Sequence, residues 1–311
     1  MKTFFILFLS LLSLLPVASR AEEKRIVLIA GKASHGSGEH EGRAGCLLFQ
    51  KCLAGFPGVT VEVCSNGWPE NPAVLNGAAA LVIYSDGGAG HPALQDDHLP
   101  TLAALMKKGT GLVLIHYAVE PTTNGQTEFL DWLGGAFEIN RSVNPVWPAE
   151  IKLLPQHPIA RGVKPFTLKD EWYFNLKFRD GMKGVTTILA AVPPADTMER
   201  ADGPHEGNPG VRAAVTRGDA QILAWACERA DGGRGFGFTG GHFHRNWGDE
   251  NFRRVMLNGI LWTAKVEVPP TGVESVLTAA DVAANQDLKG RKARLAAQNA
   301  LTNPPAATPT K

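Results

Sequence analysis

The sequence predicts an α/β fold in which helices cover both faces of a mostly parallel sheet. A first strand is expected at 25–30, where an apolar run leads into a glycine, as in strands that are buried on both faces. Strand-like and helix-like patterns then alternate, which favours parallel strands joined by right-handed crossovers. The alternating elements are a helix over 39–53, a strand over 59–63, a strand over 80–84, a helix over 94–108 and a strand over 111–115.

The second half of the chain is less regular, because many Pro and Gly residues predict long loops. Asp249 is expected to cap a helix that reaches about Trp262, and the fold is expected to close near Ala264. Before that helix, the patterns predict a helix from Phe129 that stops at Gly134-Gly135, and strands over 149–154, 185–192, 222–227 and 236–239.

Residues 269–311 are expected to form a tail that begins at Pro269-Pro270. Thr278 and Asp281 have the spacing of a capping box, which predicts one short helix. The end of the tail, from Asn303, is rich in Pro, Ala and Thr, a composition typical of disorder.

Composition indicates an ordinary globular protein of one domain with appendages. The 311 residues are 44% hydrophobic, and 31 Lys and Arg balance 30 Asp and Glu. No basic cluster lies in the body of the chain, so nucleic acid and anionic membrane surfaces are improbable partners. Four cysteines are too few for a disulfide scaffold, and buried thiols are favoured over bridges.

The N-terminus has the pattern of a signal peptide over 1–21. Lys2 precedes an apolar run from Phe4 to Val17, and Ser19-Arg20-Ala21 offers a small-x-small cleavage pattern. The apolar run is shorter than the roughly 18 residues that a bilayer span needs, so no membrane anchor is expected. The sequence therefore predicts a periplasmic or secreted protein.

Histidines concentrate where predicted strands end. In open α/β sheets the ligand crevice lies outside the carboxyl ends of the strands, so residues that follow strands are the best candidates for function. A structural role remains the alternative for any one of them, but their joint placement favours a shared site. The six histidines at predicted strand ends, out of nine, are His35, His40, His91, His116, His242 and His244.

The loop Gly31–Glu41 precedes a predicted helix and is glycine-rich, yet it matches neither phosphate-binding fingerprint in full. Glu39 and Glu41 fall in the first helical turn, where they complement the positive end of the helix dipole and would repel a phosphate. A neutral polyol or a metal ion fits this loop better. A well-capped helix with solvent-facing charges is the alternative.

His116 occupies the sharp strand-to-helix turn at which α/β hydrolases and amidotransferases place a nucleophile. No G-x-S-x-G motif occurs and no cysteine lies at this turn, so Ser or Cys acyl transfer has no visible nucleophile. An imidazole here is suited to acid–base chemistry or to metal ligation. A histidine satisfied by neighbouring carbonyls is the alternative.

His242 and His244 have i, i+2 spacing, which in an extended segment directs both rings to one side. One of the two is expected to be catalytic or ligating. With His116 they are the possible ligands of a divalent metal, to which Glu39, Asp86 or Glu120 would add a carboxylate. Apart from this metal, the sequence indicates no cofactor.

Asp170 and Glu171 are adjacent to Trp172 and Tyr173, in a region where aromatic rings could give a sugar a flat apolar face. Adjacent residues on a strand face opposite ways, so the two carboxylates are not a ready acid–base pair. Core packing is the alternative interpretation for the tryptophans. The three tryptophans in question are Trp147, Trp172 and Trp247.

Several motifs in order resemble the ThuA-like (trehalose utilisation) family, in the secreted form common in planctomycete-type bacteria. The resemblance covers about 24–268 and implies the flavodoxin-like, doubly wound fold of the class I glutamine amidotransferase-like superfamily, with a link to catabolism of trehalose and 3-keto sugars. His116 stands where an amidotransferase has its nucleophilic Cys, so glutaminase activity is not expected. The motifs are Gly31–Glu41, Tyr84–Pro92, Leu114–Glu120, Asp170–Tyr173 and Asp231–His244.

We therefore expect an exported enzyme that acts on a small carbohydrate, of the trehalose type or a 3-keto disaccharide, as a lyase, hydrolase or isomerase. Because no nicotinamide fingerprint is present, any oxidation of the sugar would fall to a separate oxidoreductase. A non-catalytic sugar-binding or scaffold module is the alternative. The expected catalytic residues are His35, Glu39, His116, His242 and His244, and the expected substrate contacts are Ser34, His40, Asp86, His91, Tyr117, Glu120, Glu171, Trp172, Asn246 and Trp247.

Overall fold

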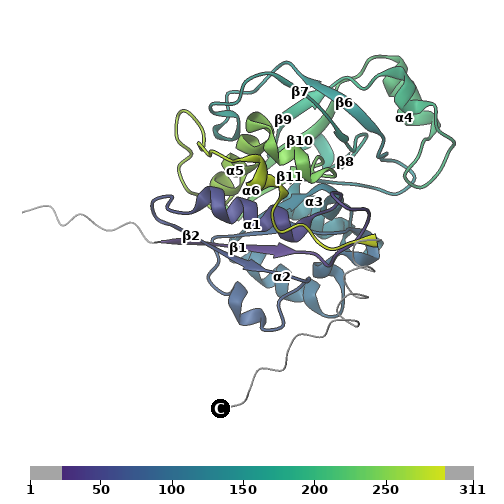
Figure 1. Cartoon of the computed structure of the whole chain (residues 1–311). Helices are drawn as coiled ribbons and strands as arrows, with labels where there is room; N and C mark the ends of the chain where they lie inside the picture. Colours follow the sequence, from purple (N-terminus) through teal and green to yellow (C-terminus); the bar gives the residue numbers. More distant parts are fainter. Residues whose placement is uncertain (1–22, 291–311) are drawn as a thin grey trace, which may run out of the picture.

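A seven-stranded sheet forms the centre of the computed structural model, which describes residues 23–290 (Figure 1). The strand order is β2-β1-β3-β4-β11-β10-β9, in which the first five strands are parallel and β10 is antiparallel to both of its neighbours. The mostly parallel α/β fold is therefore as the sequence predicts. The strands are β1 (Lys24–Ala30), β2 (Val59–Cys64), β3 (Ala80–Tyr84), β4 (Gly111–Ile115), β9 (Val185–Ala191), β10 (Gln221–Glu228) and β11 (Arg234–Phe238).

Helices cover both faces of this sheet. Strand β1 shows why: Ile26 and Leu28 pack into one hydrophobic core, while Val27 and Ile29 pack into a second core on the opposite face. The first core also contains residues of α1 (Gly42–Leu53) and α5 (Glu250–Thr263), and the second contains residues of α2 (His98–Lys107) and α3 (Gln126–Leu133). A strand buried on both faces explains the continuous apolar run in its sequence.

Two helices begin later than their sequence patterns predict. The first was expected from Glu39, but α1 begins at Gly42, because Glu39 forms a β-bridge with Phe243 and His40 has a left-handed φ of 46°. The second was expected from Leu94, but α2 begins at His98 after a 3-10 helix over Pro92–Leu94. In both places tertiary contacts override the local helical pattern.

A β-hairpin lies beyond the antiparallel edge of the sheet. It consists of β6 (Val146–Ile151), which begins earlier than the predicted strand over 149–154, and β7 (Phe166–Glu171), which the sequence pattern did not indicate. Figure 1 shows this pair with β9 and α4 (Pro209–Thr216) in the upper part of the molecule, away from β1 and β2. The short strands β5 (Gly135–Ala136) and β8 (Lys177–Phe178) form a second small pair. The end of β7 carries Glu171 back towards the sheet.

The chain after α5 continues to pack against the fold, whereas the sequence suggested closure near Ala264. Val268 and Val273 are buried in the core that α1 and α5 share. The predicted capping box is present, since the Thr278 hydroxyl accepts from the Asp281 amide and helix α6 (Ala279–Ala283) follows. The predicted signal peptide over 1–21 and the predicted disorder from Asn303 lie outside the described residues.

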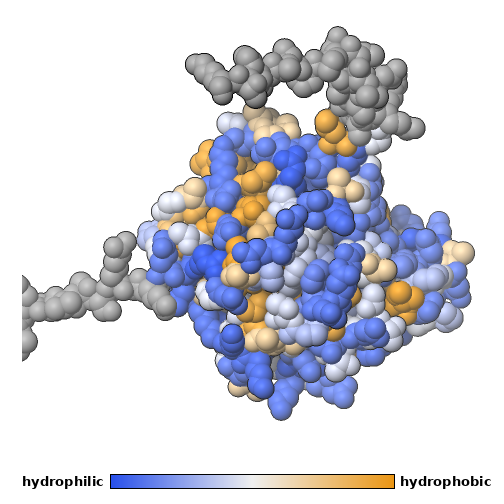
Figure 2. All heavy atoms as spheres, turned by 90° about the horizontal axis from the view of Figure 1, so that it is seen from below, coloured by the Kyte–Doolittle hydropathy of each residue, from blue (hydrophilic) through white to orange (hydrophobic). Residues whose placement is uncertain are grey.

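The surface is mainly hydrophilic on the face shown in Figure 2, where hydrophobic residues are interspersed with hydrophilic ones. Within residues 23–290 no helix has both the length and the apolar character that crossing a membrane requires. The four cysteines, Cys46, Cys52, Cys64 and Cys227, are free thiols.

We expect Gly42→Ala to destabilise the fold by about 1–3 kcal/mol, because a Cβ at this first residue of α1 would collide with the backbone carbonyl oxygen of Tyr84. Urea unfolding measures the change. Gly248→Ala is the matched control, since its Cβ would meet only Val282 at an ordinary 3.8 Å, and we expect a change within about 0.5 kcal/mol. Equal stability of the two variants would contradict the close packing of α1 on β3.

Candidate functional site

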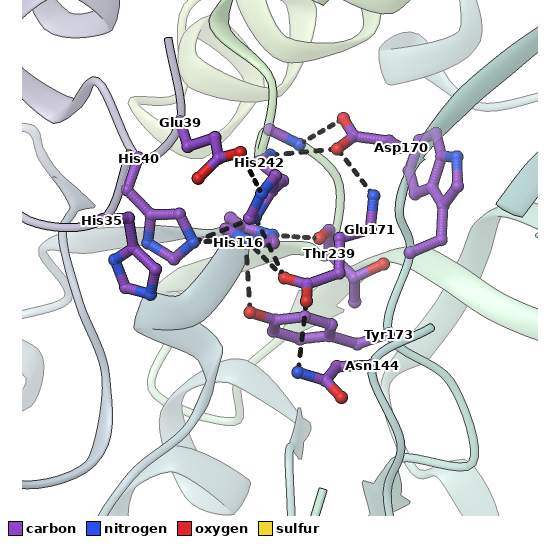
Figure 3. A network of polar contacts seen from close by, with 12 residues as sticks. His35, Glu39, His40, His116, Asn144, Asp170, Glu171, Tyr173, Thr239 and His242 are labelled. Carbon is purple, nitrogen blue, oxygen red and sulfur yellow. Dashed lines mark hydrogen bonds and ion pairs between the residues drawn. The ribbon is translucent and has the colours of Figure 1, made fainter. Parts of the chain in front are cut away.

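The loops that follow β1, β3, β4 and β11 meet at the carboxyl edge of the sheet, as the position of the histidines predicts (Figure 3). His40 and His116 have ring centroids 4.7 Å apart, and His40 and His242 have centroids 4.9 Å apart. His35 stacks on His40 with centroids 3.5 Å apart. Glu171, from the end of β7, completes the group.

His116 is fixed by a hydrogen bond at the end of β4. Its φ of 57° is left-handed, which gives the strained turn expected at this position. The side chain is 1% exposed, and Nδ1 lies 2.8 Å from the carbonyl oxygen of Thr239. A carbonyl only accepts, so Nδ1 carries a proton and Nε2 is the nitrogen that faces the site. The Tyr173 hydroxyl lies 3.2 Å from that Nε2.

His40 is held in the same way by a carboxylate. Its Nδ1 lies 3.0 Å from Oδ1 of Asp86, which leaves the lone pair of Nε2 to face His116 and His242. Burial lowers the pKa of His40 to about 3, despite the opposing hydrogen bond to Asp86. His40 is therefore neutral throughout the physiological range.

His242 is positioned through its backbone by the buried carboxylate of Asp170. That carboxylate accepts from the amides of Gly241 at 2.8 Å and His242 at 3.1 Å. Nδ1 of His242 lies 3.1 Å from Oε2 of Glu171, and Nε2 lies 3.8 Å from Oε1 of Glu39. Burial alone would lower the pKa of His242, but the hydrogen bond and charge of Glu171 outweigh it and raise that pKa.

Four ligand atoms converge on one point between these side chains. Nε2 of His116 lies 3.2 Å from Nε2 of His40 and 3.3 Å from Oε2 of Glu171. Nδ1 of His242 lies 3.1 Å from Nε2 of His40. All four atoms lie within 4.8 Å of one another. Since His40 presents the lone pair of Nε2 to this point, a cation held there would take that lone pair as a ligand.

This donor set suits a divalent metal ion. Metal–ligand bonds of about 2.0–2.1 Å place ligand atoms roughly 3.3 Å apart in a tetrahedron, and four of the six distances between these atoms, 3.2, 3.3, 3.1 and 3.1 Å, are close to that length. The second nitrogen of each imidazole faces an oxygen, as in metal-bound histidines. The oxygen belongs to the Thr239 carbonyl for His116, to Asp86 for His40 and, at 3.8 Å, to Glu39 for His242. Asn144 donates to the second oxygen of Glu171 at 3.2 Å.

A rim of polar side chains borders this donor set on the side of the β1 loop. His35 has a side chain that is 38% exposed, and Asp86 also takes a hydrogen bond from Ser34 at 2.8 Å. Burial lowers the pKa of His35, with Asp86 opposing the shift. His35, Asp86 and the half-buried Tyr117, 6.3 Å from His35 between ring centroids, are thus placed to contact a bound molecule. Glu39 lies beside His242.

His244 does not share the orientation of His242, which corrects the expectation from their spacing. The chain leaves the extended conformation after Phe243 and forms a 3-10 helix over His244–Gly248, so the alternation of side chains ends there. His244 is fully buried, and neither ring nitrogen has a hydrogen-bond partner among the described residues. Burial lowers its pKa, with the charge of Glu41 opposing. His244 is outside the donor set.

Four of the expected substrate contacts lie inside the protein. His91 is fully buried and caps a 3-10 helix through Ala93, which explains its position at a strand end. Trp172 donates to the Leu168 carbonyl, and Trp247 packs on Phe49 with ring centroids 4.8 Å apart. Asn246 donates to the Lys169 carbonyl. Trp147 is also buried, so core packing is the correct interpretation of these tryptophans.

Three residues of the site, Asp170, Tyr173 and His205, were not expected as site residues from the sequence, whereas Glu171 was expected as a substrate contact. Asp170 and Glu171 do face opposite ways as predicted, yet Asp170 binds backbone amides and Glu171 joins the histidines. Tyr173 lies in the short motif Asp170–Tyr173, and this place in the motif is the signal that could have identified it. His205, which lies 3.0 Å from both oxygens of Glu120, sits in an irregular loop that gave no signal.

The fold and site define an α/β protein with a cluster of histidines and carboxylates at the carboxyl ends of its parallel strands. This chain belongs to the ThuA family, described as trehalose utilisation, whose model matches residues 27–263. None of the curated proteins compared with it matches the chain.

Two solved structures of ThuA-like proteins support the same fold. A ThuA-like protein from Bacteroides uniformis ATCC 8492 is 14% identical, with a TM-score of 0.56 over 79% of this chain and 93% of that chain. A ThuA-like protein from Parabacteroides merdae ATCC 43184 is 13% identical, with a TM-score of 0.55 over 84% of this chain and 99% of that chain. A GMP synthase protein from Thermoplasma acidophilum is also similar, at 10% identity and a TM-score of 0.42, over 78% of this chain and 96% of that chain.

We expect Asp170→Asn to destabilise the protein by about 1–3 kcal/mol, because an amide in place of the carboxylate turns a donor towards buried backbone N–H groups. Urea unfolding measures this loss. Lys169→Gln is the control, since the neighbouring side chain on β7 is exposed. A variant as stable as the unaltered protein would show that the Asp170 charge does not hold the turn after β11.

Proposed function

We propose that this protein is an exported, metal-dependent enzyme that uses histidine and carboxylate groups for acid–base chemistry on a sugar. The observation that carries the proposal is the convergence of His40, His116, Glu171 and His242 on one point. Membership of the trehalose utilisation family supports a carbohydrate as the substrate. The apolar segment over 1–21 supports export to the periplasm or the medium.

The chemistry of the donors favours a divalent ion of the zinc type. Three imidazoles and one carboxylate suit Zn²⁺ better than the all-oxygen sites preferred by Mg²⁺ or Ca²⁺. Such an ion, when bound, polarises a carbonyl oxygen or lowers the pKa of water. This assignment places Glu171 and His40 in the ligand set in place of His244.

The rim residues are suited to binding the hydroxyl groups of a sugar. Asp86 accepts hydrogen bonds, and the exposed His35 and half-buried Tyr117 offer both polar atoms and ring faces. The floor beside the donor set is formed by the Tyr173 hydroxyl, whose pKa is raised well above its usual value by burial and by Glu171. Tyr173 thus stays protonated and serves as a hydrogen-bond donor.

A 3-keto disaccharide is the substrate class that this chemistry suits. The carbonyl makes the neighbouring C–H bonds acidic, so a positioned base and a group that polarises the carbonyl are sufficient for elimination or isomerisation. No covalent nucleophile is needed, in keeping with the imidazole of His116 at the turn after β4. A separate oxidoreductase would supply the keto group.

We expect the purified protein to bind one Zn²⁺ per chain, and His40→Ala, His116→Ala and His242→Ala each to abolish this binding. Elemental analysis and calorimetry with Zn²⁺ measure it. Asp86→Asn, which only weakens the orientation of His40, should lower the affinity by about 10–100-fold. His244→Ala is the matched control from the same loop and should keep the metal. Retention of metal in the first three variants would contradict the proposed ligand set.

We expect the metal-loaded protein to convert the 3-keto derivative of trehalose and to lose this activity on treatment with a chelator. Product analysis by NMR measures turnover, and readdition of Zn²⁺ should restore it. Saturable binding of the sugar with no product from it would support a non-catalytic binding module and overturn the proposed enzyme.

We expect no glutaminase or esterase activity, because His116 occupies the turn after β4 and all four thiols have a pKa raised chiefly by burial. Ammonia release from glutamine and cleavage of p-nitrophenyl acetate are the assays. Ammonia release that disappears in His116→Ala would contradict this expectation.

A further inference from the structure

We infer that His205, oriented by Glu120, is a catalytic base that works beside the metal-type donor set. This inference rests on the proposed function and names the group that moves the proton. His205 and Glu120 are separate from His40, His116, Glu171 and His242 but lie beside them, because Phe137 packs against both His205 and Tyr173, whose hydroxyl is 3.2 Å from Nε2 of His116.

The first step of the argument is the state of the imidazole. Nε2 of His205 lies 3.0 Å from both Oε1 and Oε2 of Glu120. Because a carboxylate only accepts, Nε2 carries the proton and Nδ1 presents a lone pair. The side chain is 33% exposed, and no partner binds Nδ1 among residues 23–290. The imidazole therefore has a free basic nitrogen that is accessible from outside.

The second step is the environment of the carboxylate. Glu120 is only 2% exposed, and His205 is the hydrogen-bond partner of its carboxylate among the described residues. Burial raises the pKa of Glu120, and the hydrogen bond to His205 opposes that shift. A carboxylate that faces Nε2 fixes the orientation and the tautomer of the imidazole, so Nδ1 is the nitrogen available to take a proton. In serine proteases, a buried Asp holds the imidazole of the general base in the correct tautomer and orientation.

The third step is the position of the pair relative to the donor set. The Asn144 backbone amide donates to the His205 carbonyl oxygen at 3.2 Å, while the Asn144 side chain donates to Oε1 of Glu171 at 3.2 Å. One residue thus contacts both groups. The Tyr117 hydroxyl and Oε1 of Glu120 lie 3.8 and 3.7 Å from the point where a Gly88 Cβ would be, so both border the space beside Gly88. The Tyr117 ring lies 6.3 Å from the rim residue His35 between ring centroids.

The fourth step is the rigidity of the loop that carries the base. His205 stacks on Phe137, with ring centroids 5.2 Å apart and an angle of 27° between the planes. The amide of Asn140 binds the Pro204 carbonyl at 2.9 Å, and Arg200 contacts Asn144 at 3.2 Å and forms an ion pair with Glu206. A ring fixed from several sides meets the positional demand of a proton transfer.

The proton transfer that follows is balanced. Nδ1 of His205 takes a proton from the carbon next to the sugar carbonyl, and the electron pair of that C–H bond forms a C=C bond as the carbonyl π pair moves to oxygen. In elimination, the carbonyl re-forms, the glycosidic oxygen leaves with the electron pair of its bond, and the proton on Nδ1 passes to that oxygen. In isomerisation, the proton on Nδ1 goes to the former carbonyl carbon, while the proton of the neighbouring hydroxyl group passes to the former carbonyl oxygen and a C=O bond forms at the neighbouring carbon. The imidazole regains its starting state in both cases.

The test uses the full-length metal-loaded protein and the 3-keto derivative of trehalose in D₂O. His205→Gln keeps an N–H group for Glu120 but has no base, so we expect kcat to fall by about 10²–10⁴-fold with little change in KM. Exchange of the substrate C–H for deuterium should fall in parallel. Imidazole added to His205→Ala should restore part of the activity. The matched control is His157→Asn, in which the new side chain can still cap the 3-10 helix over Pro158–Ala160.

Metal content separates failure of this inference from failure of the proposed function. His205→Gln should bind Zn²⁺ as the unaltered protein does, and its melting temperature should be close to the original. Full kcat and full deuterium exchange in His205→Gln, together with an inactive His40→Ala, would overturn the role of His205 and leave the proposed function standing. Absence of exchange and turnover in the unaltered protein would overturn both.

Glu120→Gln tests the positioning role of the carboxylate. Its amide offers an oxygen and a donor in place of two acceptors, so the proton of His205 is no longer restricted to Nε2. We expect kcat to fall with little change in KM, and ¹⁵N NMR of the His205 ring to show loss of the single Nε2–H form. An unchanged tautomer and unchanged kcat would remove Glu120 from the mechanism.

Discussion

The buried carboxylate of Asp170 joins the two parts of the chain on which the site depends. It binds the amides of Gly241 and His242 after β11 from the end of β7, and its sequence neighbour Glu171 faces the opposite way, towards the imidazoles. Because side chains alternate along β7, the hydrogen bonds that anchor Asp170 also place Glu171 on the opposite side, with Oε2 3.1 Å from Nδ1 of His242. A β-hairpin outside the main sheet thereby determines the composition of the site.

The site is also maintained against local backbone strain. His35, His40 and His116 all have left-handed φ values, of 56°, 46° and 57°, which cost free energy for residues other than glycine. The strain is offset by contacts around the β1 loop: Lys289 binds the carbonyls of Glu39 and His40, and lies 3.3 Å from the buried carboxylate of Glu41. The segment after α5 thus stabilises the loop that presents His40.

Sequence patterns predicted the parts of this architecture that are local. The runs at β3 and β4 are continuously apolar because both faces of the sheet are covered, and the strand ends identified His40, His116 and His242. His244 was misplaced because a two-residue spacing indicates a common side only while the backbone stays extended. The contacts of Glu171 and His205 could not be predicted, since they depend on how a hairpin and a long loop return to the cleft.

The balance of charge explains why these groups favour a cation in the cleft. His40 is kept neutral by burial, and it brings a lone pair rather than a positive charge to Glu171. The carboxylates of Asp86 and Glu171 keep low pKa values because hydrogen bonds outweigh the cost of burial, so both remain ionised. Lys289, the buried cation nearby, is engaged by Glu41. The ionised carboxylate of Glu171 and the inward lone pair of His40 thus meet where the four ligand atoms converge, and a divalent ion held there would take both as ligands.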